Sequence, residues 1–455
     1  MSSINTRKED DFSKWYHEVI EATKLVDFTA VKGCVVYHDY CLRIWNEIKS
    51  FLNYKLVPLG FNEYYFPSLI PLKSFKKQEK HFEDFFKEVL IVSKAGHNQL
   101  EEEYVIRPTS EAIIYESIAK WVKEEKHLPL CINQYCSVMR WESFKPNMPL
   151  LRGNEFLWQE SHSIHSSKKE AEVYVKKILD IYRELHEDYL AMPCIIGYKP
   201  QHRMFPGAEY TLALESLMPD MKSVQSATSH YLGQNFSKAF NIKFKGKEEY
   251  AYQACNGITT RVIGALVMLH GDNKGLVIPP KIAPYQAVLI GFDDKNIVDM
   301  LKSNGIRYFV DSGKSVNEKI DYWTLMGAPI IALKNKGKYA LIRRDTLEKI
   351  SINKSSLANQ VKKILNSIQD NLYKKAKKFH SNHISKASSW QEFEKIAFGK
   401  KGFIEANWCG SVDCAKQIRE KTNKNSIRIV NPLKSGKCVH CKSKAQYTAM
   451  FAPAY

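Results

Sequence analysis

Two arginines in the middle of the chain, Arg140 and Arg152, flank a loop of eleven residues, 141–151. Two fixed guanidinium groups at the mouth of a hairpin can clamp a polyphosphate from both sides, with more geometric specificity than lysines. Phe156 offers an aromatic face to a purine, and Arg261 could cover the opposite face through a cation–π contact. These residue types indicate a nucleotide site. Surface salt bridges beside core aromatics would produce the same pattern, so the four residues alone leave both interpretations open.

Four cysteines near the end of the chain form a second candidate site. Cys409 and Cys414 are followed, about two dozen residues later, by Cys438 and Cys441. Two cysteine pairs at this separation fit a structural zinc ion with tetrahedral thiolate ligands. The same residues could instead form two disulfides. The ten cysteines of the chain show no small-scaffold disulfide pattern, which favours a reducing cytosol and therefore zinc.

The composition limits the class of protein. The chain has 455 residues, of which 44% are apolar and 25% charged, so it is not mostly disordered. The apolar run 262–269 is too short to span a membrane, and residues 1–11 contain no apolar signal segment. We therefore expect a cytoplasmic protein. The net charge of +18 favours a polyanionic partner such as nucleic acid, although a lysine-rich proteome would give the same surplus.

The elements that must position these residues follow from hydrophobic periodicity. Residues 11–57 are expected to be helical with short interruptions, and residues 170–190 to form one amphipathic helix. Strands are expected at 60–67, 130–138, 155–159, 210–214 and 249–254. Helices and strands alternate without a regular βαβ repeat, which favours a mostly antiparallel α+β domain.

Three prolines at 279, 280 and 284 mark the clearest boundary, because they cannot extend a helix or a central strand. The next 100 residues alternate strand and helix, with strands expected at 287–291, 308–310, 329–333 and 339–342 and helices at 297–301 and 319–326. A lysine-rich helical segment and a cysteine-bearing tail follow. We predict three domains, at 1–283, 284–380 and 381–455.

Several longer segments carry a family resemblance. Arg-Pro-Thr-Ser-Glu at 107–111, Glu-Phe-Leu-Trp-Gln-Glu at 155–160 and Thr-Ser-His-Tyr-Leu-Gly-Gln-Asn-Phe at 228–236 resemble the prolyl-tRNA synthetases. The segment 60–67, the hairpin that begins at Arg140 and the helix at Arg261 resemble the three class II synthetase motifs. The resemblance covers residues 8–455 and is greatest to the archaeal and eukaryotic form, which has a C-terminal zinc-binding domain.

The resemblance implies a fold and an activity. Residues 1–283 would form the class II antiparallel-sheet catalytic domain, residues 284–380 an α/β anticodon-binding domain, and residues 381–455 a small α+β zinc-binding domain. The protein would be a homodimer that ligates L-proline to tRNA(Pro) through a prolyl-adenylate. ATP with Mg²⁺ would be the cosubstrate, and zinc would be structural.

Roles at individual positions are implied in the same way. The secondary amine, carboxylate and ring of proline would be held by Thr109, Glu111, Arg140, Trp158, Glu160, His162, His230 and Cys255. ATP would be held by Arg140, Glu142, Arg152, Phe156, Gln225, Thr228 and Arg261, with Arg140, Arg152 and Arg261 stabilising the reacting phosphate. Anticodon bases would be contacted by Trp323, Arg343, Arg344 and Asp345.

The chain also departs from the family pattern. Asn256 stands where relatives have a tryptophan on the pocket side, Ser161 replaces a glycine, and Asn154 replaces an arginine. Thr324 and Ile331 stand where polar anticodon contacts are usual. These departures favour an alternative, a synthetase-like paralogue that activates an amino acid without charging ordinary tRNA. A non-enzymatic protein that binds zinc and nucleic acid is a third alternative, and it would require a damaged ATP site.

Overall fold

A computed structural model describes residues 4–77, 88–142, 148–244, 248–313, 315–422 and 424–455. Its central feature is one sheet of eleven strands with the order β20-β21-β23-β22-β9-β10-β11-β14-β8-β7-β3. The N-terminal region contributes seven of them: β3 (Phe61–Glu63), β7 (Leu130–Met139), β8 (Glu155–His165), β9 (Ile195–Tyr198), β10 (Tyr210–Leu217), β11 (Ser223–Gly233) and β14 (Tyr252–Thr259). In this spatial order, each neighbouring pair from β9 through β10, β11, β14 and β8 to β7 is antiparallel, as predicted.

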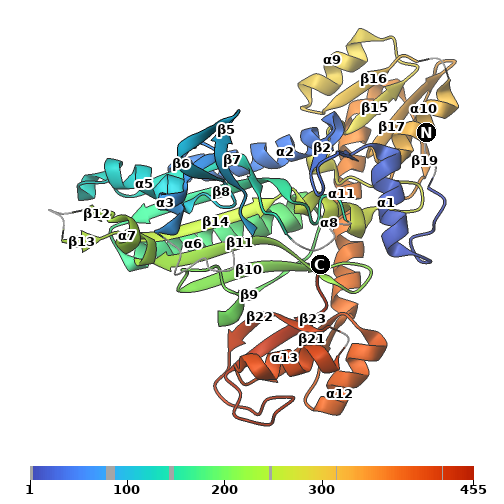
Figure 1. The fold of residues 1–455 in the computed structure, drawn as a ribbon. Helices are drawn as coiled ribbons and strands as arrows, with labels where there is room; N and C mark the ends of the chain where they lie inside the picture. Colours follow the sequence, from blue (N-terminus) through green and yellow to red (C-terminus); the bar gives the residue numbers. More distant parts are fainter. Residues whose placement is uncertain (1–3, 78–87, 143–147, 245–247, 314, 423) are drawn as a thin grey trace.

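Helix α6 (Lys168–Glu184) covers one face of this sheet (Figure 1). Ser167 caps its N-terminus by accepting a hydrogen bond from the Glu170 backbone N–H at 3.3 Å. Of the apolar face that periodicity predicted, Ile178, Ile181 and Leu185 are buried, whereas Tyr174 and Tyr189 are half-buried. The other buried side chains of the helix are Ala171, Val175, Leu179 and Tyr182. The last turn of the predicted helix, Leu185–Tyr189, continues as a π-helical turn.

The remaining N-terminal elements surround the sheet. Residues 11–57 form α1 (Phe12–Thr23) and α2 (Asp39–Leu56), and a β1–β2 hairpin (Val26–Phe28 and Val35–Tyr37) interrupts them. A small sheet joins β4 (Leu69–Pro71), β5 (Ile91–Ala95) and β6 (Asn98–Ile106). Shorter elements are α3 (Leu72–Lys76), α5 (Glu111–Trp121), α7 (Asn235–Phe240), β12 (Lys243–Phe244), β13 (Glu249–Tyr250) and α8 (Arg261–His270). The strand expected at 249–254 is therefore divided at Ala251, which is buried between β13 and β14.

The middle region forms its own α/β layer, seen at the upper right of Figure 1. Its five strands have the order β16-β15-β17-β18-β19. They are β15 (Ala287–Ile290), β16 (Tyr308–Asp311), β17 (Ile330–Asn335), β18 (Lys338–Arg343) and β19 (Lys349–Ile352), with helices α9 (Lys295–Ser303) and α10 (Val316–Leu325). Helix α11 (Leu357–Asn382) then crosses to the C-terminal region, so the boundary predicted at 380 falls inside a helix.

The C-terminal region extends the central sheet. It contains β20 (Ile384–Lys386), α12 (Trp390–Lys395), β21 (Phe403–Trp408), α13 (Val412–Lys421), β22 (Ser426–Pro432) and β23 (Tyr447–Ala452). Strand β22 pairs with β9 at Val430 and Tyr198. Beside this pair, Arg428 makes a bidentate ion pair with Glu215 of β10, with N···O distances of 2.9 and 3.0 Å, and both side chains are buried. The tail is therefore tied to the N-terminal sheet, a connection that the sequence did not predict.

No helix in the described ranges is long and apolar enough to cross a membrane. This agrees with the composition, in which the apolar runs are short.

Because His186 is buried, we predict that the folded protein loses stability at acidic pH. His186 is fully buried and its ring contacts the Tyr182 carbonyl at 2.7 Å, and burial lowers its pKa to about 4. The unfolded chain has an ordinary histidine pKa and binds the proton more readily, so the stability contribution of neutral His186 is complete above pH 6.5 and is lost as the pH falls toward 4. We expect His186 to cost roughly 2 kcal/mol of unfolding free energy between pH 7 and pH 5.

Urea unfolding of the wild type and His186→Gln at both pH values measures this cost. The variant should be less stable than the wild type at pH 7, and this difference in unfolding free energy should shrink by about that amount at pH 5. A deficit that is the same at both pH values would contradict the prediction.

Candidate active site

The register of β8, β14 and β11 places three candidate residues side by side across the sheet. Cys255 of β14 pairs with His162 of β8 on one side and with His230 of β11 on the other. Directly paired residues point to the same face of a sheet, and residues two positions apart share that face. Glu160 and Trp158 therefore lie on the same face as His162. This face is opposite to the one that α6 covers.

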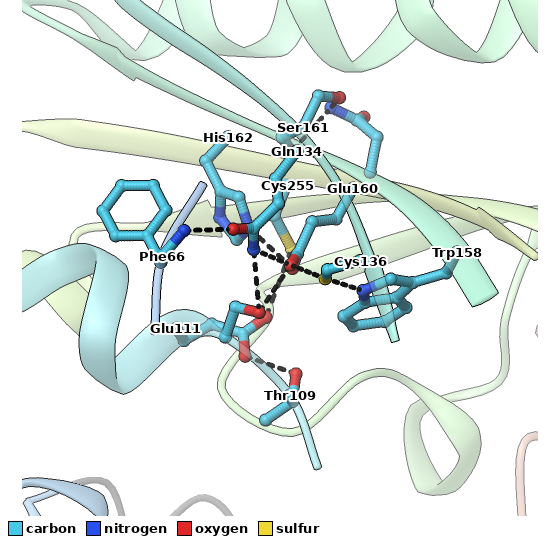
Figure 2. A network of polar contacts seen from close by, with 12 residues as sticks. Phe66, Thr109, Glu111, Gln134, Cys136, Trp158, Glu160, Ser161, His162 and Cys255 are labelled. Carbon is cyan, nitrogen blue, oxygen red and sulfur yellow. Dashed lines mark hydrogen bonds and ion pairs between the residues drawn. The ribbon is translucent and has the colours of Figure 1, made fainter. Parts of the chain in front are cut away.

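Glu160 is the best-satisfied carboxylate of the site (Figure 2). Its Oε1 accepts hydrogen bonds from Ser110 Oγ at 2.5 Å and Gln134 Nε2 at 2.7 Å, and its Oε2 lies 3.1 Å from His162 Nε2. Burial alone would raise the pKa of Glu160, but the hydrogen bonds outweigh it and the pKa lies below its ordinary value. Glu160 is therefore an anion that is held in place by His162, Ser110 and Gln134.

Glu111, the first residue of α5, has fewer donors. Thr109 Oγ1 donates to its Oε2 at 2.5 Å, and Cys255 Sγ lies 4.0 Å from its Oε1. Burial raises the pKa of Glu111, although the neighbouring His162 works against this. A buried carboxylate with a raised pKa gains most from an incoming cation. A protonated secondary amine supplies that charge together with two N–H donors.

The other end of the site is cationic. Arg140, directly after β7, donates from Nε to the Pro108 carbonyl at 2.9 Å, and its guanidinium lies 5.5 Å from the Phe156 ring centroid and 5.8 Å from that of Trp158. Arg261 begins α8 and donates from Nε to the Leu151 carbonyl at 2.9 Å. Burial, together with nearby Arg152, lowers the pKa of Arg261 to about 10, so it remains charged at neutral pH. A bound polyphosphate would offset the cost of crowding these cations.

Both ends line one cavity of about 360 Å³. Every residue predicted to hold proline or ATP is on its wall: Thr109, Glu111, Arg140, Glu142, Arg152, Phe156, Trp158, Glu160, His162, Gln225, Thr228, His230, Cys255 and Arg261. The loop predicted between Arg140 and Arg152 lies partly outside the described residues, at 143–147.

Sequence reasoning missed the layer behind these residues. Ser110 and Gln134 hold Glu160, and Tyr115 Oη lies 3.0 Å from His162 Nδ1. Lys199 and Arg203 also line the cavity. The signal for Gln134 was available, because an amide in the middle of an apolar strand must find a partner when it is buried. Lys199 and Arg203 carried no comparable signal.

Comparisons with known proteins extend over the same regions. A family model described as the tRNA synthetase class II core domain (G, H, P, S and T) matches residues 92–270, an anticodon-binding domain model matches 286–364, and a model of the prolyl-tRNA synthetase C-terminal domain matches 390–455. A proline--tRNA ligase of Borreliella burgdorferi (strain ZS7) is 38% identical over 100% of both chains. Proline--tRNA ligase 2 of Clostridioides difficile (strain 630) is 38% identical, and that of Bacillus thuringiensis subsp. konkukian (strain 97-27) 36%, each over 99% of this chain and 98% of the relative.

The chain belongs to the proline–tRNA ligase family of class II aminoacyl-tRNA synthetases. These matches confirm the family and the fold class that the sequence predicted. The class II core, the anticodon-binding domain and the family's C-terminal domain follow one another in the expected order.

Two departures from the family pattern, Asn256 and Ser161, contact each other. Asn256 lies along the cavity wall but is 2% exposed, and its Nδ2 donates to Ser161 Oγ at 3.2 Å. Asn256 Oδ1 contacts Ser229 Oγ, which in turn donates to the Val175 carbonyl of α6 at 2.7 Å. The Asn256 amide therefore points to the face of the sheet that α6 covers, where it belongs to a buried polar cluster. It is not offered to a ligand, so it gives no support to the paralogue alternative.

The residues predicted to read the anticodon have internal partners. Trp323 is 5% exposed and donates from Nε1 to Asp311 at 2.8 Å. Arg344 is 3% exposed and makes a bidentate contact with Asp272 at 2.6 and 2.8 Å. Arg343 and Asp345 pair with each other at 2.8 Å. Because Trp323 and Arg344 are buried, we do not assign them to base recognition.

The four candidate metal ligands converge. Cys409, Cys414, Cys438 and Cys441 have all their sulfurs within 4.8 Å of one another, and none forms a disulfide. The Sγ atoms of Cys414 and Cys438 are 3.7 Å apart, and those of Cys409 and Cys441 are 3.5 Å apart. Tetrahedral Zn–S bonds of about 2.3 Å require sulfurs about 3.8 Å apart, so this donor set fits zinc.

Proposed function

We propose that this protein is a cytoplasmic enzyme that ligates L-proline to tRNA(Pro) through a prolyl-adenylate, with ATP and Mg²⁺ as cosubstrates. The observation that carries the proposal is the cavity itself, which has buried carboxylates at one end and three arginines at the other. Membership of the proline–tRNA ligase family supports the same activity.

The proposed roles follow from the two ends. Glu111 and Thr109 would receive the protonated amine, while Trp158, His162 and His230 enclose the ring beside Glu160. Phe156 and Arg261 would face the adenine, and Gln225 and Thr228 the rest of the nucleotide. The carboxylate of proline attacks the α-phosphate, pyrophosphate leaves, and Arg140 stabilises the charge that develops at phosphorus. Magnesium, when bound to ATP, would neutralise part of the charge on the phosphates.

Two assays in sequence test the function. Proline-dependent ATP–pyrophosphate exchange measures activation, and esterification of purified tRNA(Pro) measures transfer. We expect both. Exchange without transfer would select the paralogue, and loss of both would select a non-enzymatic protein.

The anticodon should contribute modestly to tRNA identity. Thr324 and Ile331 replace the usual polar contacts, and Trp323 and Arg344 are buried. Lysines at the β17–β18 turn, among them Lys336 and Lys338, would contact phosphates, which supplies affinity but little base information. Changing both guanines of the proline anticodon should lower charging by less than about a thousandfold, or roughly 4 kcal/mol. A larger loss would show that other side chains read these bases.

We also propose a two-fold homodimer, because the segment around β3 resembles the class II motif that forms the dimer interface. Light scattering at micromolar concentration should give twice the chain mass of 52.5 kDa. A mass equal to one chain would reject the dimer.

We propose a structural zinc ion on Cys409, Cys414, Cys438 and Cys441. Elemental analysis of freshly purified protein should find about one zinc per chain. Cys441→Ser should lose the metal, whereas Cys194→Ser, outside the cluster, should keep it. If freshly purified wild-type protein contained no zinc, the proposed zinc site would be wrong. Because β22 pairs with β9, chelation should loosen the end of the central sheet as well as the tail.

A further inference from the structure

A second cavity opens where the C-terminal region meets the N-terminal sheet, near the C-terminus of the chain in Figure 1. Its volume is about 570 Å³. It shares Arg152 and Arg203 with the cavity that holds the candidate active site, so the two spaces adjoin. We call it the basic cleft, defined by Arg152 and Arg203 on one side and by Lys401, Arg419 and Lys424 on the other.

The charged side chains that line the basic cleft are mostly positive. Seven of its thirteen described lining residues are Lys or Arg, and Asp220 is the one acidic side chain among them. Asp220 is already engaged, because Lys222 Nζ lies 2.9 Å from its carboxylate and the Tyr455 hydroxyl also contacts it. The cleft therefore has a surplus of positive charge that Asp220 cannot neutralise.

Five of the seven cations of the cleft divide into two groups. Arg428 is neutralised by Glu215, and Arg203 donates to the Ile427 carbonyl at 3.3 Å, so these two help to build the wall. By contrast, the side chains of Lys401, Arg419 and Lys424 are exposed, and none makes a hydrogen bond or ion pair with the described residues. The C-terminal region thus presents three uncompensated cations beside the active site.

The two walls of the cleft are fixed relative to each other. The β22–β9 pairing and the buried Glu215–Arg428 ion pair join the regions that supply them. A preorganised row of cations costs little rearrangement when a polyanion binds. An open cleft with fixed walls suits an extended chain of phosphates.

We propose that the basic cleft binds the backbone phosphates of the single-stranded 3′ end of tRNA as that end enters the active site. This inference rests on the proposed function, in which the terminal ribose of tRNA must reach the carboxyl carbon of the adenylate near Arg140. The shared residues Arg152 and Arg203 place the cleft beside the cavity that Arg140 lines. Lysine and arginine contacts of this kind bind phosphate without reading base sequence.

The test uses the double variant Arg419→Gln/Lys424→Gln, which removes two cations and keeps a polar side chain at each position. The KM for tRNA(Pro) in charging should rise roughly tenfold. The slope of log Kd against log salt should become shallower by about 1.4, at about 0.7 for each single-strand phosphate that the variant no longer neutralises. Proline-dependent ATP–pyrophosphate exchange should remain within twofold of the wild type, which also shows that the variant is folded.

The matched control is Lys395→Gln/Lys434→Gln, which removes the same charge from exposed positions of the C-terminal region that line neither cavity. Its KM for tRNA(Pro) and the slope of its log Kd against log salt should equal those of the wild type. An unchanged KM and salt slope in the Arg419/Lys424 variant would overturn the proposal, as would equal losses in the control. A raised KM for pyrophosphate in exchange would also overturn it, because the cleft would then be a small-anion site. Wild-type protein that neither exchanges nor charges would instead refute the proposed function.

Discussion

Replacing Arg140 by alanine should lower kcat/KM for proline-dependent ATP–pyrophosphate exchange by about 10²–10³-fold, or roughly 3–4 kcal/mol. Arg140 joins the two ends of the cavity, because its Nε is anchored on the Pro108 carbonyl and its guanidinium lies over Phe156 and Trp158. A cation fixed in this way stabilises charge that develops at the α-phosphate without having to rearrange during the reaction. The loss should therefore fall mainly on kcat.

The matched control is Arg183→Ala, which removes an exposed arginine that pairs with Asp180 on the surface of α6. Its exchange rate should equal that of the wild type. Exchange by Arg140→Ala within threefold of the wild type would show that Arg140 does not stabilise the reacting phosphate.

Glu111→Gln should raise the KM for proline by about 10²-fold and change the KM for ATP much less. The glutamine is isosteric and can still accept a hydrogen bond from Thr109, so the change removes charge and little else. In the wild type, the amine of proline would compensate a buried carboxylate whose pKa burial has raised. Without the negative charge of Glu111, the desolvated ammonium group would lose its direct counter-ion.

The pH dependence provides an independent readout. Because the pKa of free Glu111 is raised, protonation should weaken proline binding as the pH falls, and Glu111→Gln should abolish this part of the dependence. Glu103→Gln, at an exposed position of β6, serves as the control and should behave as the wild type. A proline KM that rises less than threefold in Glu111→Gln would contradict the assignment.

Local patterns predicted the parts of the fold that depend on local physics. Helix α6 has an apolar stripe at the helical period, so its amphipathic helical structure could be inferred. The cysteine spacing likewise predicted the cluster at Cys409, Cys414, Cys438 and Cys441. In both cases the residues that determine the structure are close in sequence, or their chemistry permits few partners.

Local patterns were insufficient where the outcome depends on strand register or on distant pairing. A shift of one residue moves a side chain to the other face of a sheet, and this decides that the Asn256 amide lies under α6 rather than in the cavity. The contact between Val430 and Tyr198 joins strands from distant parts of the chain, and no local pattern encodes it. The partner of Arg344 is Asp272, in another region of the chain, so its burial could not be predicted from its own neighbours.

The most direct test of the account is a crystal structure of the protein with a non-hydrolysable prolyl-adenylate analogue. We predict that the pyrrolidine nitrogen lies within about 3.2 Å of the Glu111 carboxylate, with the linking group on Arg140 and the adenine between Phe156 and Arg261. An analogue with its ring nitrogen turned away from Glu111, or its adenine outside the Phe156–Arg261 space, would contradict the central claim that this one cavity holds both halves of the adenylate.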